Sequence, residues 1–344
     1  NALPTTSSGY ALYEDARSYD PQSSTDVPNV QTTYTYTTSA TTADVVYTGS
    51  SSSAYLGSGW SPVSMGDLNG DGYDDFMAGA NAQIYFGHAS IGSGFNASAT
   101  YLGTPVDLGD VGRSAAVGDI DGDGYQDMMV SSPDGATNYI VYGGSNASSW
   151  TAPVTWASGA GVGSAPRLTK VVSETGITLN GTYSSLGDIN GDGYDDLLIS
   201  AFGTNSSDPN DFNAKNNGGL YVVFGQSGHW SNGDLNLTNL ATNKLGFRIT
   251  GAVDFDNAGQ YSWTGVGDMN GDGLDDFIFQ APGDNESGNA GSTSLGSSYL
   301  IFGRQAGWQD ISLLEMQDYG IQLLRTGNGY WTALGDVDGD GYDD

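Results

Sequence analysis

The stretch GDLNGDGYDD at residues 66–75 decides the fold, because it recurs four more times in the chain. The later copies are GDIDGDGYQD at 118–127, GDINGDGYDD at 187–196, GDMNGDGLDD at 267–276 and GDVDGDGYDD at 335–344. The first aspartates of successive copies are 52, 69, 80 and 68 residues apart. Repetition at such intervals is typical of a protein built from copies of one supersecondary unit. We therefore expect a repeat architecture.

Short apolar runs flank the copies in a constant order. After each of the first four copies comes an apolar run, then a turn of small residues, then a run ending in an aromatic residue and glycine: 76–78 and 84–87, 128–130 and 140–143, 197–199 and 222–225, 277–279 and 300–303. Another short run precedes the copies, as at 183–186 and 331–334. Short runs bounded by Gly, Asn, Asp and Pro indicate strands, not helices. Three or four such strands per repeat predict an all-β fold made of β-propeller blades.

The composition excludes several classes of protein. The 344 residues carry a formal charge of −31 with only nine Lys and Arg, so nucleic acid and anionic membranes are poor partners. No stretch of eighteen apolar residues occurs, which argues against membrane insertion. The 21 Tyr, 11 Phe and 7 Trp argue against a disordered acidic chain. Cysteine is absent, so neither disulfides nor a thiolate zinc site hold the fold.

The repeated loops have the oxygen pattern of a calcium site. We number nine positions from the first aspartate and name the loops 1 to 5: 67–75, 119–127, 188–196, 268–276 and 336–344. Positions one, five and nine are always Asp, position three is Asn or Asp, and positions four and six are always Gly. Side-chain oxygens at one, three, five and nine, with the backbone carbonyl of position seven, match the ligands that Ca²⁺ prefers.

The expected ligands follow from these positions. They are Asp67, Asn69, Asp71, Tyr73 and Asp75 in loop 1; Asp119, Asp121, Asp123, Tyr125 and Asp127 in loop 2; Asp188, Asn190, Asp192, Tyr194 and Asp196 in loop 3; Asp268, Asn270, Asp272, Leu274 and Asp276 in loop 4; and Asp336, Asp338, Asp340, Tyr342 and Asp344 in loop 5. Position eight is Asp in four loops but Gln126 in loop 2, whereas position nine never varies. We therefore expect position nine, not eight, to face the metal, and the apolar residue at position two to point into the blade.

Three other interpretations of the loops fit less well. An EF-hand requires a glutamate at position twelve, where this chain has Ala78, Val130, Ile199 and Phe279. Acidic turns without metal would place four or five carboxylates within nine residues with nothing to offset their repulsion. A catalytic metal would need open coordination positions and a nearby base. We expect a structural role for up to five calcium ions, which would change the formal charge from −31 to −21 (five times +2).

Together, the aromatic-Gly pair, the small-residue turn and the DxNGDGxDD loop resemble the FG-GAP repeat of integrin α-subunit propellers and of bacterial surface proteins. The resemblance covers about residues 44–344. It implies four-stranded blades, a ring that is seven-bladed when complete, calcium loops on one face and ligand docking on the opposite face. Loop 5 ends at Asp344, so we expect the propeller to be incomplete at the C-terminus, truncated within the fifth repeat.

Residues 1–43 are expected to form an N-terminal arm or linker, and residues 44–344 the propeller. Within the first part, Thr33–Thr37 alternates as a strand does. Val45–Gly49 resembles the aromatic-Gly strand of a preceding blade. Either run could serve as a closing strand for the last blade.

Nothing in the sequence marks a catalytic group. The two histidines, His88 and His229, follow aromatic-Gly strands without partners at the spacing of a catalytic triad. Among the tryptophans, Trp263 and Trp331 fall in expected strands and are assigned to the core, whereas four in longer connections are candidates for ligand contact: Trp150, Trp156, Trp230 and Trp308. No catalytic residue is assigned, and no residue is assigned to a cofactor other than calcium.

The sequence therefore predicts a secreted or cell-surface calcium-binding β-propeller that mediates adhesion or ligand binding and is not an enzyme. Its expected partner is an extracellular protein or a glycan. One alternative is a structural subunit of a surface layer or filament, which would self-assemble or have a second chain complete its ring. The other alternative is a polysaccharide-acting enzyme whose catalytic groups lie on loops or in the part beyond Asp344.

Overall fold

The computed structural model describes the strands of the blades and the five repeated loops. The described residues are 63–78, 83–87, 106–107, 113–132, 137–145, 147, 168–174, 177, 179, 182–201, 217–230, 234–238, 240–251, 256–260, 263–283, 296–324 and 331–344. The expectations for the arm at 1–43, for Val45–Gly49 and for His88, Trp150 and Trp156 lie outside these residues.

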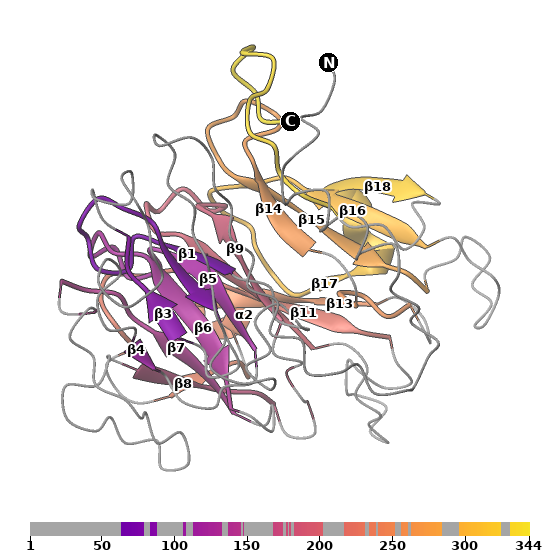
Figure 1. Ribbon diagram of the computed structural model, residues 1–344. Helices are drawn as coiled ribbons and strands as arrows, with labels where there is room; N and C mark the ends of the chain where they lie inside the picture. The colour runs from indigo at the N-terminus through magenta and orange to yellow at the C-terminus, as the bar shows by residue number, and fades with distance from the viewer. Residues whose placement is uncertain are drawn as a thin grey trace, which may run out of the picture.

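The described part of the chain contains four sheets (Figure 1). Blade 1 consists of β1 (Val63–Gly66), β2 (Asp75–Ala78), β3 (Gln83–Tyr85) and β4 (Val106–Asp107). Blade 2 consists of β5 (Ser114–Gly118), β6 (Asp127–Ser131), β7 (Asn138–Val141), β8 (Leu168–Val172) and β12 (Leu235–Asn236). Blade 3 consists of β9 (Tyr183–Gly187), β10 (Asp196–Ser200), β11 (Gly219–Val223), β13 (Gly246–Thr250) and β17 (Ile311–Ser312). Blade 4 consists of β14 (Trp263–Gly267), β15 (Asp276–Ala281), β16 (Ser297–Ile301) and β18 (Gly320–Leu324).

Each blade is a four-stranded antiparallel meander, as expected. The fifth strands β12 and β17 add to the outer edges of blades 2 and 3 in parallel orientation. The helices whose bounds lie within the described residues are the short α2 (Leu240–Asn243) and the 3-10 helix η4 (Leu313–Asp318). None of the described helices has the length and apolar character that crossing a bilayer requires. The fold class is therefore the predicted all-β propeller.

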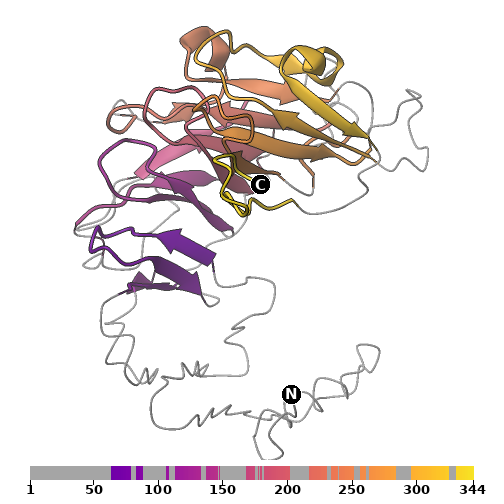
Figure 2. The same ribbon diagram turned by 90° about the horizontal axis from the view of Figure 1, so that it is seen from above.

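The blades follow one another in chain order along an arc (Figure 2). Their first strands β1, β5, β9 and β14 contact one another in that order, as strands do around a common axis. In each blade the first and second strands are joined by one of the repeated loops, so loops 1 to 4 lie at the same end of successive blades.

Apolar layers between neighbouring blades form the core. The strand β6 illustrates this, because Met128 and Val130 belong to the layer shared with blade 1, whereas Met129 belongs to the layer shared with blade 3. Alternate side chains of a strand point to opposite faces of its sheet. A strand covered on both faces must therefore be apolar throughout, which explains the continuous apolar runs after the loops.

The fifth repeat differs from its expected form. Residues 331–334 were predicted to form a strand, but the structure assigns none there. A strand requires a hydrogen-bonded neighbour, which in the other repeats is the run after position nine, and no described strand lies in that place beside residues 331–334. The segment nevertheless packs against blade 4, where the Trp331 indole donates to Ser298 Oγ at 2.9 Å. Trp331 is thus a partly exposed blade contact and not the core residue that was predicted.

Candidate metal-binding loops

Position one holds each loop in shape. In loop 1 Asp67 Oδ1 accepts the backbone N–H groups of Gly70 (2.7 Å) and Asp71 (3.0 Å), and Oδ2 accepts that of Gly72 (2.7 Å). The same three bonds recur in every other loop. The chain must turn sharply to bring three successive amides to one carboxylate, and Gly70 and Gly72 adopt positive φ angles of 72° and 88° there. Glycine adopts these angles without steric cost.

Positions three and five extend the turn. Asn69 Oδ1 accepts the amide of Asp71 at 2.9 Å, and Asp71 Oδ1 accepts the amide of Tyr73 at 3.0 Å. The other four loops repeat both bonds. Oxygen-bearing side chains at one, three and five are thereby held along the inside of one tight loop.

In loops 1 to 4, position nine links the loop to the third strand of its blade. The buried Asp75 carboxylate accepts the amide of Leu68 at 2.9 Å and that of Gly87 at 2.8 Å. Gly87 is the glycine of the aromatic-Gly pair, and loops 2, 3 and 4 repeat both bonds. Only a short acceptor with two oxygens satisfies both amides, which explains why position nine never varies.

Burial makes these position-nine carboxylates difficult to ionise without a cation. Desolvation, opposed in part by the two amide bonds, raises the pKa of Asp75 and of Asp276 to about 6 and that of Asp127 to about 8. The pKa of Asp196 is raised well above its ordinary value for the same reason. Neighbouring aspartates raise all four pKa values further. A bound dication would offset both effects.

Position eight contacts the preceding blade, not its own loop. Asp195 Oδ2 accepts the amide of Asp119 at 2.8 Å, and the Asp195 amide donates to the Asp119 carbonyl at 3.2 Å. Loops 4 and 5 make the same pair of bonds to the loop before them. Gln126 retains the backbone bond, donating to the Asp67 carbonyl at 3.2 Å. The substitution at position eight is tolerated because half of the contact does not involve the side chain.

Position seven also contacts the preceding blade, which sequence reasoning did not foresee. The ring of Tyr125 lies so close to Gly70 that a Cβ on that glycine would collide with it, and Tyr194 covers Gly122 in the same way. Leu274 takes the tyrosine's place over Gly191. Only the carbonyl of position seven was assigned a role from the sequence, yet its side chain helps to dock the blades.

Position two is buried as predicted in three loops, at Leu68, Ile120 and Ile189. In loop 4 the prediction is wrong, because Met269 is 37% exposed, and in loop 5 Val337 is 67% exposed. The segment after the aromatic-Gly pair of the next blade covers position two and donates to its carbonyl, as Arg304 does to Ile189 at 2.9 Å. No described segment does so for loops 4 and 5.

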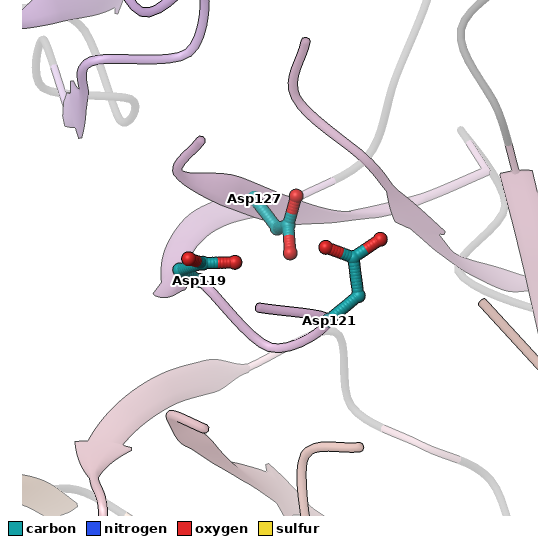
Figure 3. Close-up of side chains that lie close together, drawn as sticks. All are labelled: Asp119, Asp121 and Asp127. Carbon is teal, nitrogen blue, oxygen red and sulfur yellow. The ribbon is translucent and has the colours of Figure 1, made fainter. Parts of the chain in front are cut away.

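In two loops, carboxylate oxygens from three positions come within 4.8 Å of one another. Loop 2 brings together Asp119, Asp121 and Asp127, whose carboxylates converge in Figure 3. Loop 5 brings together its positions one, three and five. These oxygen-only donor sets suit a hard cation such as Ca²⁺. Loops 2 and 5 therefore fit the ion that the sequence indicated.

Loop 2 has an additional neighbour that the sequence did not reveal. The Nε2 atom of His229 lies 2.9 Å from Asp121 Oδ2, and its ring packs against Tyr142 with centroids 4.1 Å apart. His229 belongs to the segment after β11 in blade 3, and its contact with Asp121 was not predicted. Its 108-residue distance from Asp121 in sequence left no signal for this pairing.

Two of the tryptophans that are candidates for ligand contact pack against the core and stay partly exposed. Trp230 is partly buried against the core between blades 2 and 3. Trp308 stacks on Phe247 with centroids 4.5 Å apart in the layer between blades 3 and 4. Trp263, assigned to the core, lies in β14 and packs against that same layer.

Comparison with known proteins agrees with this architecture. Residues 67–130 match the family described as FG-GAP-like repeat, and residues 180–223 match the FG-GAP repeat family. No curated protein matches the chain. The matched segments correspond to loop 1 through β6 and to blade 3 from the start of β9 through β11. This chain is a β-propeller built from FG-GAP repeats.

Proposed function

We propose that this protein is an extracellular or cell-surface propeller that calcium stabilises and that binds a protein or glycan ligand. The observation that carries the proposal is the five-fold loop, in which backbone amides hold acidic side chains around one turn. Each loop gathers four or five aspartates, and among the described residues only His229 brings a basic side chain within 4 Å of a loop carboxylate. Such a surface is stable when dications offset its charge, and calcium is abundant outside cells.

In this proposal the ions have a structural role. Asp119, at position one of loop 2, is held by Asp195 of the next blade. Ordering one loop therefore also orders the contact between two blades. Metal binding of this kind contributes directly to folding free energy.

The ligand is proposed to dock at the opposite end of the blades. The second and third strands are joined at that end, and these connections are long in blade 3 (201–218) and blade 4 (282–296). Binding residues are concentrated on long connections that a rigid scaffold positions. FG-GAP propellers are typically not catalytic, and ligand binding is accordingly preferred to enzymatic activity.

The test is retention of the purified protein on an array of glycans and extracellular-matrix proteins. Calcium-dependent binding to one class, lost in EDTA and restored by calcium but not by magnesium, is the expected result. Circular dichroism of the same samples establishes that the calcium-loaded protein is folded. A blank array with folded, calcium-loaded protein would contradict the ligand-binding proposal.

A further inference from the structure

Loop 2 differs from the other loops in how the next blade covers it. Asp121 replaces the asparagine found at position three of loops 1, 3 and 4, and its side chain is only 1% exposed. His229 Nε2 lies 2.9 Å from Asp121 Oδ2. Because a carboxylate oxygen accepts and does not donate, Nε2–H is the donor of this bond. The preceding Gly228 also donates its amide to the Asp121 carbonyl at 3.0 Å.

The blade 3 segment that carries His229 thus contacts Asp121 at two points. The corresponding segment of blade 4, which runs FGRQAGW where blade 3 has FGQSGHW, places Gly307 at the histidine position. Its Gln305 lies near Gly191 of loop 3, without a comparable contact to position three. The histidine and the aspartate at position three therefore occur together only in this pair of blades among the described residues.

The two oxygens of Asp121 have separate partners. Oδ1 accepts the Asp123 amide at 3.1 Å, and Oδ2 accepts from His229. Together these bonds fix the rotation of a buried carboxylate that lies within 4.8 Å of Asp119 and Asp127 oxygens. Hydrogen-bond partners that orient a ligating carboxylate contribute to metal affinity even though they do not touch the ion.

We propose that His229 is a positioning residue for the cation of loop 2, which it fixes through Asp121 so that filling this loop fastens blade 3 to blade 2. This inference rests on the proposed calcium role of the loops. The histidine acts from the next blade, so loop 2 is completed only when the two blades are docked. Loss of the donor should weaken one cation site by about ten- to a hundred-fold and leave the others unchanged.

Two variants separate the donor from the ring. His229→Phe keeps an aromatic ring to pack on Tyr142 but removes the N–H, whereas His229→Gln keeps an N–H donor and removes the ring. His88→Phe, which changes the only other histidine, is the matched control. Calcium affinities are measured by competition with a chromophoric chelator, and the melting temperature of each variant is measured in EDTA and in calcium.

The expected result is one weakened site in His229→Phe, an affinity closer to wild type in His229→Gln, and no change in His88→Phe. The difference in melting temperature between wild type and His229→Phe should be larger in calcium than in EDTA. A purely packing role would lower the melting temperature equally in both conditions and would overturn the inference, as would identical affinities in all variants. Absence of calcium binding in the wild type would instead overturn the proposed calcium role itself.

Discussion

At position nine a single carboxylate satisfies two amides from different strands. Asp196 accepts from Ile189 and from Gly225, each at 3.0 Å, and it is fully buried. Asp195 next to it is partly exposed and accepts one amide of the preceding blade. Adjacent aspartates thus serve different purposes, one within its blade and one between blades.

The first prediction compares these two residues. Asp196→Ala leaves two buried amides unsatisfied and should lower the free energy of unfolding by about 2–4 kcal/mol. It should also weaken calcium binding at one loop. Asp195→Ala removes one bond and should cost about 1 kcal/mol. Urea unfolding and calcium titration of both variants test the difference, and equal losses would contradict the assignment of position nine.

The second prediction concerns the pH dependence of the metal-free protein. Burial raises the pKa of Asp127 to about 8, whereas in the unfolded chain the pKa of an aspartate is about 4. Between these values the folded state binds more protons than the unfolded state, so the free energy of unfolding should fall as pH rises from about 4 to about 8. Asp127→Asn should flatten this slope in chelator-treated protein. A slope that the substitution does not change would refute the prediction.

At the scale of elements, the loops that are the proposed metal sites also form contacts between blades. The side chains at positions seven and eight of one loop reach position four and position one of the loop before it. The glycines at positions four and six, which are present in all five loops, are accordingly required for different reasons. Gly124 has a φ of 92° with open space around it, whereas Gly122 has a φ of 73° and also lies under the Tyr194 ring.

The third prediction follows from that difference. Gly124→Ala should cost about 1–2 kcal/mol, the cost of a left-handed backbone for a residue with a Cβ. Gly122→Ala should cost about 1–3 kcal/mol more, because its methyl group collides with Tyr194. Adding Tyr194→Ala to Gly122→Ala should recover part of that excess. Chemical denaturation of the four proteins decides the matter, and equal costs for both glycines would show that the ring contact is unimportant.

At the scale of the whole molecule, apolar layers join neighbouring blades, whereas the loops at one end of the blades are all negatively charged. The chain has 40 acidic and nine basic residues, and 21 of the acids lie in the five loops. Five ions would leave a charge of −21, so repulsion between neighbouring loops would be reduced but not removed. Stability of the arc should therefore depend on calcium more than on salt in general.

The fourth prediction is a large shift in melting temperature on chelation. A ligand at 100 times its Kd stabilises the folded state by about 2.7 kcal/mol per site. Two such sites alone would raise the melting temperature by about 10 °C or more. Differential scanning fluorimetry in EDTA and after calcium is restored measures this shift, with magnesium as the matched control. An unchanged melting temperature would count against metal binding in the loops.

The sequence alone determined the repeat, the strand order and the spacing of the acidic side chains within each loop. These are local properties. The spacing of Asp and Gly within nine residues sets the shape of each loop, and the short apolar runs set the position of each strand. The tertiary structure decided what the same residues do for their neighbours. Position eight, the Tyr125 ring and the pairing of His229 with Asp121 depend on which loop lies beside which. A contact between residues more than fifty positions apart leaves no pattern in one chain, since either partner alone has the composition of an ordinary turn.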